Sequence, residues 1–151
     1  MYPDREAIGK GCEMYGPFEM QVVIGSSDCD ALGHMNVSRY FALCNQAGFA
    51  MQTAIGWPPG AENAGRRYSF AVVHSESDFL AEVHAGEALV VQTGIAEIGN
   101  KTADFDNRIA RKDGTPVFRS VWKSVLMDLD TRRAVIIPED LRFSLMRRSI
   151  V

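Results

Sequence analysis

The chain has 151 residues, of which 46% are hydrophobic and 23% charged, and its formal net charge at pH 7 is -3. These values are typical of one globular domain and exclude the disordered and fibrous classes. The slight acidic excess argues against a general nucleic-acid-binding protein, which usually carries a basic excess. The chain contains no apolar run long enough to cross a bilayer, and its first residues lack the apolar core of a signal peptide. We therefore expect a cytoplasmic protein that binds neither nucleic acid nor membrane.

The cysteines and histidines do not indicate a metal site. Cys12, Cys29 and Cys44 show neither a metal-binding spacing nor an even disulfide framework, which fits a reducing compartment. His74 and His84 lack acidic neighbours at the spacing that a metal set requires. We expect no metal and no redox cofactor.

The first predicted element is a strand. Residues 1–16 mix charged, glycine and small residues without a period, so we interpret them as an N-terminal extension and residues 17–151 as the folded domain. In residues 18–24, Phe18, Met20 and Val22 alternate with polar residues, which predicts a strand with one buried face.

A polar loop and a long apolar helix come next. Asp28 and Asp30 lie in the loop, and Asn36 stands where a helix cap is expected. From Val37 to about Ile55, apolar residues recur at a spacing of three and four over so much of the circumference that the helix should be buried. Its free N–H groups would favour an oxygen that gains negative charge close to the loop carboxylates. Alternatively, the two aspartates only cap the loop and the helix.

The remaining residues are predicted to form an antiparallel meander. Pro58 and Pro59 end the helix, and residues 61–67 form a polar loop. Strands are then expected at 68–77, 87–97, 101–110 and 117–129, with a hairpin at Gly99-Asn100 and a short helix starting at 138–141. This order indicates an α+β domain in which about five antiparallel strands curve around a long central helix. Because one sheet cannot cover every side of that helix, we expect a symmetric dimer.

The loop and the start of the helix carry a family resemblance. Residues 28–40, with the sequence DCDALGHMNVSRY, resemble the signature loop of hotdog-fold acyl-CoA thioesterases of the 4-hydroxybenzoyl-CoA thioesterase-like branch. Residues 82–91 resemble that family's entry into its third strand, and residues 99–101 its next hairpin, so the resemblance covers roughly residues 18–140. It implies the hotdog fold, hydrolysis of an acyl-CoA to the free acid and CoA, and assembly as a dimer or a dimer of dimers. Within the branch, residues 33–40, Val73-His74 and the turn at 82–86 resemble thioesterases found with carnitine breakdown, which cleave betainyl-CoA.

The resemblance also implies the catalytic groups. It places the catalytic carboxylate on Asp30, as a nucleophile or as a general base, and the N–H that polarises the thioester carbonyl on the backbone of Val37. Family members often carry Asn or another polar residue at that position, so any side-chain contact made there is lost in this chain. Hotdog dehydratases and another thioesterase branch place an acid on the helix, whereas residues 37–55 contain no Asp or Glu. This absence favours Asp30 and argues against a dehydratase, and Asp28 is expected to be structural.

Four further residues are predicted to bind substrate: His34, Asn36, Tyr40 and Lys101. His34 either orients substrate, contacts Asp30 or packs the loop, and Tyr40 lines the core or the edge of an acyl pocket. Lys101, like Arg66, Arg108 and Arg111, would contact the CoA phosphates or lie on a solvated face. The alternative function is a non-catalytic module of the same fold that binds acyl-CoA or an acyl carrier, and the sequence does not indicate the acyl group.

Overall fold

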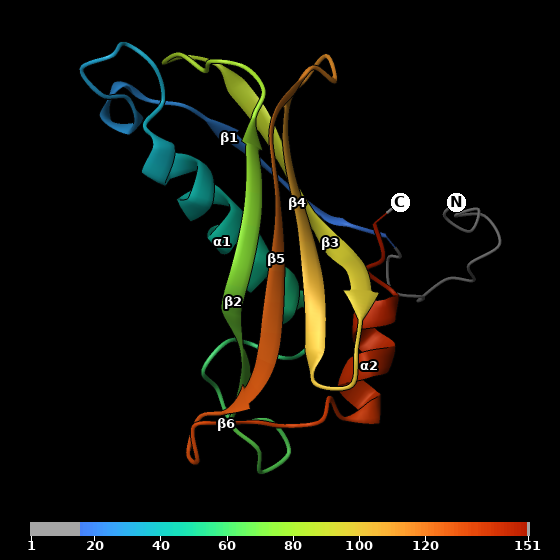
Figure 1. Ribbon diagram of the computed structural model, residues 1–151. Helices are drawn as coiled ribbons and strands as arrows, with labels where there is room; N and C mark the ends of the chain where they lie inside the picture. The colour runs from blue at the N-terminus through green and yellow to red at the C-terminus, as the bar shows by residue number, and fades with distance from the viewer. Residues whose placement is uncertain (1–15, 151) are drawn as a thin grey trace, which may run out of the picture.

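The computed structural model describes residues 16–150, which form one long helix against an antiparallel sheet (Figure 1). The predicted extension therefore lies, except for Gly16, outside the described residues. The elements in chain order are β1 (Phe18–Val23), the 3-10 turn η2 (Ser26–Asp28), α1 (Val37–Ala54), β2 (Tyr68–Phe79), β3 (Ala88–Ile98), β4 (Thr102–Arg111), β5 (Pro116–Asp128), β6 (Arg133–Ala134) and α2 (Glu139–Met146). The strand order is β1-β3-β4-β5-β2, with β6 paired to β5. The expected α+β architecture is confirmed. The predicted meander is correct for β3, β4 and β5, but β2 pairs with β5 instead of β3, and the two-residue strand β6 is an addition.

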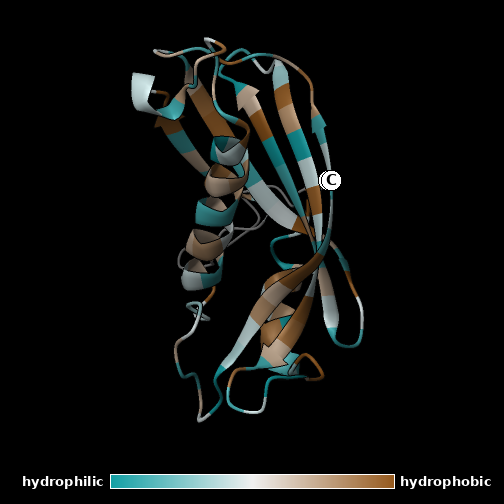
Figure 2. Cartoon of the chain, turned by 60° about the vertical axis from the view of Figure 1, so that its left-hand side comes forward, coloured by the Kyte–Doolittle hydropathy of each residue, from teal (hydrophilic) through white to brown (hydrophobic). Residues whose placement is uncertain are grey.

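Helix α1 lies along the curved sheet, and the strands alternate between hydrophobic and hydrophilic bands (Figure 2). Leu43, Ala47 and Met51 are fully buried on one face of the helix, in keeping with their helical spacing. The register pairs Phe105 with Trp122 and Ile109 with Phe118, which places these side chains in rows on one face of the sheet. The core between α1 and the sheet comprises two clusters of buried residues, and α2 contributes to the second. Within the described residues, no helix is both long and apolar enough to cross a membrane.

Both ends of α1 are set by local chemistry. At the start, the Asn36 side chain accepts a hydrogen bond from the Ser38 N–H at 2.9 Å, as expected of a helix cap. At the end, Gly56 takes a positive φ of 86°, and the Trp57 N–H donates to the Gln52 carbonyl at 2.9 Å. The predicted helix is thus confirmed within one residue.

Strand β2 differs from the prediction in length and regularity. It continues to Phe79, whose ring contacts Tyr40 at a centroid distance of 5.2 Å and Phe118 at 5.0 Å. The strand therefore ends two residues after the predicted end at residue 77, and the half-exposed Phe79 ring packs against these two buried aromatic side chains. A register shift between Val72 and His74 is a bulge, and it explains the imperfect alternation of the sequence.

The C-terminal segment closes the far end of the core. Leu141 and Leu145 of α2 are buried in a cluster with Met51, Phe105 and Leu126. The Ile95 N–H donates to the Arg148 carbonyl at 2.8 Å, which fixes the segment after α2 against β3. Gly94 permits this approach, because a Cβ there would lie 2.8 Å from the Arg148 carbonyl oxygen.

Candidate active site

The signature loop is a compact turn held by its own backbone. The Gly33 N–H donates to the Asp30 carbonyl at 3.0 Å, and the Asp30 N–H donates to the His34 carbonyl at 3.1 Å. Gly33 has a φ of 87°, a conformation that glycine adopts without steric cost. Met35 is fully buried and anchors the loop in the core. The loop therefore holds Asp30 in a defined place at the start of α1.

The carboxylate of Asp30 is held by two donors. Its Oδ1 accepts from the Leu32 N–H at 2.9 Å, and its Oδ2 accepts from the Asn36 side-chain amide at 2.9 Å. The Leu32 N–H, followed by the Asn36 amide, lowers the pKa of Asp30 below its usual value of 3.8. The group is consequently an ionised, oriented carboxylate at neutral pH.

Asn36 connects this carboxylate to the helix N-terminus. One end of its side-chain amide holds Asp30, while the other end accepts from the Ser38 N–H at 2.9 Å. Val37 is the first residue of α1, and the N–H at that position has no partner within a helix. The positive end of the helix dipole adds to the attraction for an anionic oxygen. The Asp30 carboxylate and the N-terminus of α1 are thus connected through the single side chain of Asn36.

Asp28 has a different environment. Its carboxylate accepts from the Gly25 N–H at 2.8 Å and pairs with Arg39 Nε at 2.9 Å. These contacts tie the 3-10 turn to the first turn of α1, in agreement with the expected structural role. The two loop aspartates therefore have separate environments.

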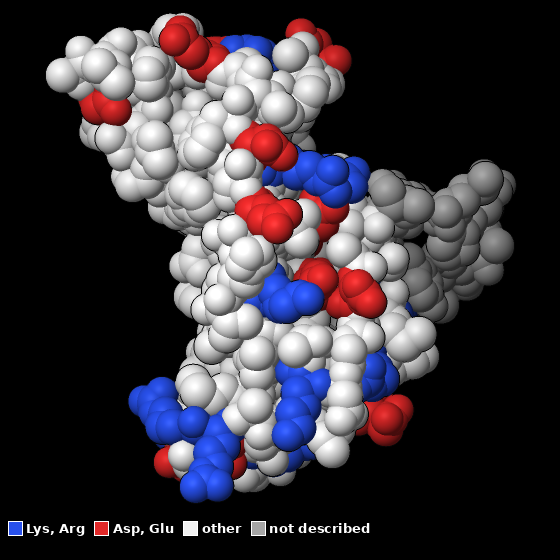
Figure 3. Space-filling view, in the orientation of Figure 1, with Lys and Arg blue, Asp and Glu red and all other residues white. Residues whose placement is uncertain are grey.

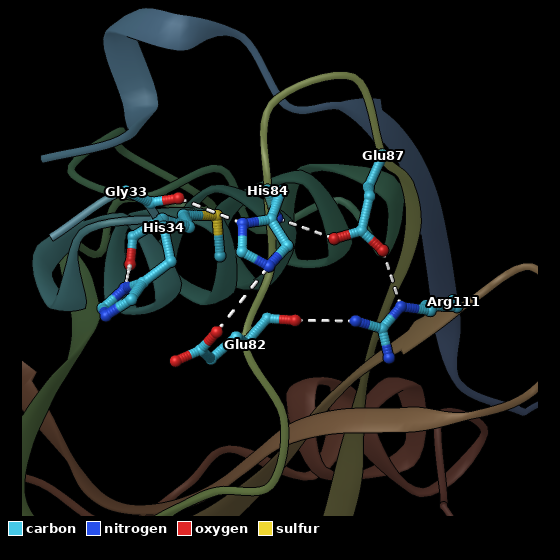
Figure 4. A network of polar contacts seen from close by, with 7 residues as sticks. Gly33, His34, Glu82, His84, Glu87 and Arg111 are labelled. Carbon is cyan, nitrogen blue, oxygen red and sulfur yellow. Dashed lines mark hydrogen bonds and ion pairs between the residues drawn. The ribbon is translucent and has the colours of Figure 1, made fainter.

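A polar network clamps the loop to the connection between β2 and β3 (Figure 4). His84 Nδ1 lies 3.0 Å from the Gly33 carbonyl, so Nδ1 must carry the donated proton, and the Met35 N–H donates to the Val83 carbonyl at 2.7 Å. Glu87 accepts from the His84 N–H at 2.7 Å and pairs with Arg111 Nε at 2.6 Å. Arg111, followed by the His84 N–H, lowers the pKa of Glu87. Arg111, proposed for CoA phosphates, is thus engaged in positioning this connection.

The other predicted binding residues separate into those near the loop and those far from it. His34 is in the loop, and its Nδ1 lies 3.1 Å from the Met35 carbonyl. Tyr40 is 3% exposed among Phe41, Phe79 and Phe118, and burial raises its phenol pKa. Its side chain is therefore a core residue at the first turn of α1.

Lys101 lies at the opposite end of the protomer from Asp30. Val23 of β1 pairs with Ala88, so the loop after β1 is beside the start of β3, whereas Lys101 follows the end of that 11-residue strand. At about 3.3 Å per residue, the separation is about 35 Å. Arg66 pairs with Asp140 at 3.0 Å, and Arg108 pairs with Asp106 at 3.1 Å. None of these three side chains meets Asp30 within one protomer.

A cavity of about 200 Å³ lies between α1 and the sheet. The helix lines it with Cys44, Asn45, Gly48, Phe49 and Gln52. The sheet lines it with Phe70, Val72, Phe105, Asn107, Trp122 and Ser124. Burial raises the pKa of the Cys44 thiol to about 12, so this thiol is neutral. The cavity is a candidate acyl pocket with aromatic walls and a few polar groups.

Sequence reasoning missed most of the pocket. The sheet residues come from three strands, and only their pairing brings them together. One signal was present: Asn107 shares a predicted strand face with Ala103, Phe105 and Ile109, and a polar residue in a buried row is unusual. Within residues 16–150, no group of three or more His, Cys, Asp or Glu side chains is arranged to hold a metal ion.

Several solved structures share this fold at low sequence identity. The 1,4-dihydroxy-2-naphthoyl-CoA thioesterase of Synechocystis matches with a TM-score of 0.73 and 18% identity, over 86% of this chain and 96% of that chain. A Staphylococcus aureus protein solved in complex with CoA matches with a TM-score of 0.76 and 15% identity, over 94% and 92%. A gentisyl-coenzyme A thioesterase matches with a TM-score of 0.73 and 19% identity, over 84% and 98%. Comparison with curated proteins gives no significant sequence match.

These structures confirm the predicted hotdog fold, and the family match indicates a thioester hydrolase. The chain belongs to the thioesterase-like superfamily, whose family model matches residues 24–145.

Proposed function

We propose that this protein hydrolyses an acyl-CoA thioester to the free acid and CoA, as a member of the 4-hydroxybenzoyl-CoA thioesterase-like branch, with Asp30 as the catalytic carboxylate. The observation that carries the proposal is that two hydrogen bonds orient the Asp30 carboxylate beside the N-terminus of a buried helix. The CoA bound to the Staphylococcus aureus neighbour and the aryl-CoA substrates named for two others support the substrate class.

The proposed chemistry uses the Val37 N–H and the Asp30 carboxylate. The thioester carbonyl accepts from the Val37 N–H, which stabilises the negative charge that develops on its oxygen. Asp30 then either attacks the carbonyl carbon or removes a proton from a water that attacks it. In the first route the C–S bond breaks and a mixed anhydride remains, which water hydrolyses. The CoA thiolate is a good leaving group, so the reaction needs neither a strong acid nor a cofactor.

Single-turnover hydrolysis in ¹⁸O-labelled water detects an anhydride that water opens at the Asp30 carbonyl, whereas an anhydride opened at the acyl carbonyl gives the same labelled acid as general-base catalysis. A general base gives an acid that always carries one solvent oxygen. An anhydride opened at the Asp30 carbonyl gives an unlabelled acid and leaves the label on the protein. Activity after treatment with a metal chelator tests the proposed absence of a cofactor.

The central test compares Asp30→Asn with Asp28→Asn in a CoA-release assay over a panel of acyl-CoAs. Asn at position 30 can still accept from the Leu32 N–H, so the fold should persist while turnover is abolished. Asp28→Asn weakens the pair with Arg39 and should lower stability but keep turnover. Near-full activity in Asp30→Asn would refute the assignment. If the wild type binds acyl-CoAs but releases no CoA from any of them, the protein is a binding module instead.

The panel includes betainyl-CoA, because the loop resembles enzymes that cleave it. Preferred cleavage of this cationic substrate would support that narrower assignment. A cytoplasmic location is part of the proposal, in line with the unpaired Cys29 and Cys44, and cell fractionation tests it.

The proposal includes a homodimer formed through β2, alone or as half of a tetramer. This 12-residue strand lies at the edge of the sheet, and a long edge with unpaired backbone groups invites another strand. Val73 of β2 is 61% exposed and Val37 of α1 is 54% exposed, so apolar surface remains on that side. Light scattering should give twice the protomer mass, and Val73→Glu should give monomers with reduced activity. A fully active monomer would contradict the dimer.

Such a dimer also suggests a place for the CoA phosphates. Lys and Arg side chains gather at the end of the protomer where β6 lies (Figure 3). Antiparallel β2 pairing would bring this end beside the Phe79 end of the second copy, where α1 begins. Lys101, Arg132 and Arg133 would thus serve the Asp30 loop of the other copy. Charge reversal at Arg132 and Arg133 should raise the KM for acyl-CoA but not for the matching acyl-pantetheine, which lacks the nucleotide phosphates. An equal effect on both substrates would contradict this placement.

A further inference from the structure

We infer that Asn107 determines which acyl groups this enzyme accepts, by donating a side-chain hydrogen bond to a neutral acceptor oxygen on the acyl group. The inference rests on the proposed function, since it assigns the acyl end of the same substrate to the cavity under α1. The predicted class is an acyl-CoA whose acyl part is about the size of one ring and carries an ether, carbonyl or hydroxyl oxygen.

The size of the cavity sets the size of the acyl group. Its volume is about 200 Å³. An apolar cavity of about 150 Å³ is known to accommodate benzene, so this one admits a six-membered ring with a small substituent. Phe70, Phe105 and Trp122 supply flat apolar walls, which suit such a ring.

Among the polar residues that line this cavity, Asn107 has a fully buried donor without a partner. The residue is 1% exposed, and its Nδ2 has no hydrogen-bond partner within the described residues. Buried amides are nearly always hydrogen-bonded, so a donor left open toward a cavity indicates a ligand acceptor. The neighbouring hydroxyl in the same row is engaged: Ser120 Oγ accepts from Trp122 Nε1 at 2.6 Å and lies 2.7 Å from Ser77 Oγ.

The lining determines the charge of the acyl group. The described residues around the cavity include no Asp, Glu, Lys, Arg or His. A charged acyl group would lose its hydration there without gaining an ion partner. The acceptor that Asn107 meets should therefore be neutral, which ranks betainyl-CoA below neutral oxygenated substrates.

The geometry allows one substrate to reach both Asn107 and the carbonyl site. Val37, Phe41, Asn45 and Gly48 follow one another at helical spacing, so one face of α1 leads from its N-terminus to the cavity. Asn107 is two residues along β4 from Ile109, whose pairing partner Phe118 contacts Tyr40 in the first turn of α1. Two strand residues and three helix residues together span on the order of 10 Å, which matches a ring-sized acyl group.

The test uses three thioesters, a carbocycle and two isomers in which an oxygen atom replaces one ring CH₂. In tetrahydropyran-4-carbonyl-CoA an ether oxygen replaces one CH₂ of cyclohexanecarbonyl-CoA, and the 3-carbonyl isomer moves that oxygen by one position. We expect the wild type to prefer one oxygen isomer over the carbocycle by about tenfold in kcat/KM, as one well-made hydrogen bond allows. Asn107→Leu should reduce this ratio to within about twofold while hydrolysis of the carbocycle continues.

Controls make each outcome decisive. Thr93→Val is the matched control, because Thr93 lies directly opposite Asn107 and is fully buried but does not line the cavity. It should keep the wild-type ratio. Asn107→Ala serves if the leucine variant does not fold, as judged by circular dichroism. A wild-type ratio near one for both isomers, or an unchanged ratio in the Asn107 variants, overturns the inference.

Calorimetric Kd values for the same thioesters separate this inference from the proposed function. If the protein cleaves none of them, the proposed hydrolysis fails, and the Kd ratios of the wild type and Asn107→Leu still decide the role of Asn107.

Discussion

Replacing Asn36 separates two functions that one side chain performs. Asn36 caps α1 by accepting from the Ser38 N–H, and it orients Asp30 by donating to its carboxylate. Asn36→Ala removes both contacts. Asn36→Ser keeps a good capping oxygen but lacks the amide that reaches Asp30.

The expected magnitudes follow from these contacts. Loss of an N-cap costs about 1 kcal/mol, which for a domain of this size lowers the melting temperature by roughly 2–4 °C. Asn36→Ala should show this loss, and Asn36→Ser should remain within a few tenths of a kcal/mol of the wild type. Both variants leave Asp30 with the Leu32 N–H as its remaining donor, so kcat/KM should fall about tenfold or more in each.

Two measurements on the same preparations test this reasoning. Urea unfolding gives the free energy of unfolding, and CoA release gives kcat/KM. If Asn36→Ser keeps kcat/KM within twofold of the wild type, the amide does not orient the catalytic carboxylate. If Asn36→Ala and Asn36→Ser are equally stable, the cap is not the source of the stability loss.

Three further outcomes are expected. Because the pKa of Asp30 is lowered, its carboxylate stays ionised as pH falls, and kcat/KM should not change with its protonation down to about pH 5. The pH profile of kcat/KM should fall only below the ordinary value of 3.8, and this fall should move to higher pH in Asn36→Ala. A fall of the wild-type profile near neutral pH would contradict this. Arg111→Met should lower the free energy of unfolding at pH 7, and because the folded pKa of Glu87 is lowered, part of this loss should disappear as pH falls through that pKa. The part that remains at about pH 3 belongs to the hydrogen bond from Arg111 to the Glu82 carbonyl at 2.6 Å, and a loss independent of pH would contradict the role of the ion pair. Gly94→Ala should lower the free energy of unfolding in urea by about 1–3 kcal/mol, because its Cβ would lie 2.8 Å from the Arg148 carbonyl oxygen and from Ile150 Cβ. In Gly48→Ala the new Cβ meets nothing within 4 Å, so this variant should instead be more stable by about 0.5–1 kcal/mol. Equal effects of the two substitutions would refute the steric argument.

Local signals explain what the sequence predicted well. The extent of α1 follows from its periodicity, its Asn36 cap and the prolines after Gly56, all of which are short-range. The separate environments of Asp28 and Asp30 are also local, because both are decided within the turn and the first residues of the helix.

Long-range pairing explains what was not predicted. The position of Lys101 relative to the loop depends on how β1 pairs with β3, which the hairpin signal at Gly99-Asn100 does not contain. The clamp of His84, Glu87 and Arg111 joins residues whose contacts arise only when β4 ends beside the connection between β2 and β3. Asn107 is an unusual polar residue in a buried row, but its place in the cavity depends on the pairing that brings Trp122 and Ser124 of β5 beside it.

Gly48 gives the molecule a trade-off that can be followed in its relatives. A glycine in mid-helix is a poor choice for rigidity, and its missing methyl group leaves open space next to the cavity. Laboratory selection for heat tolerance alone should therefore replace it with alanine and narrow the range of acids released. The residue at this helical position in a related enzyme would then predict how large an acyl group that enzyme accepts.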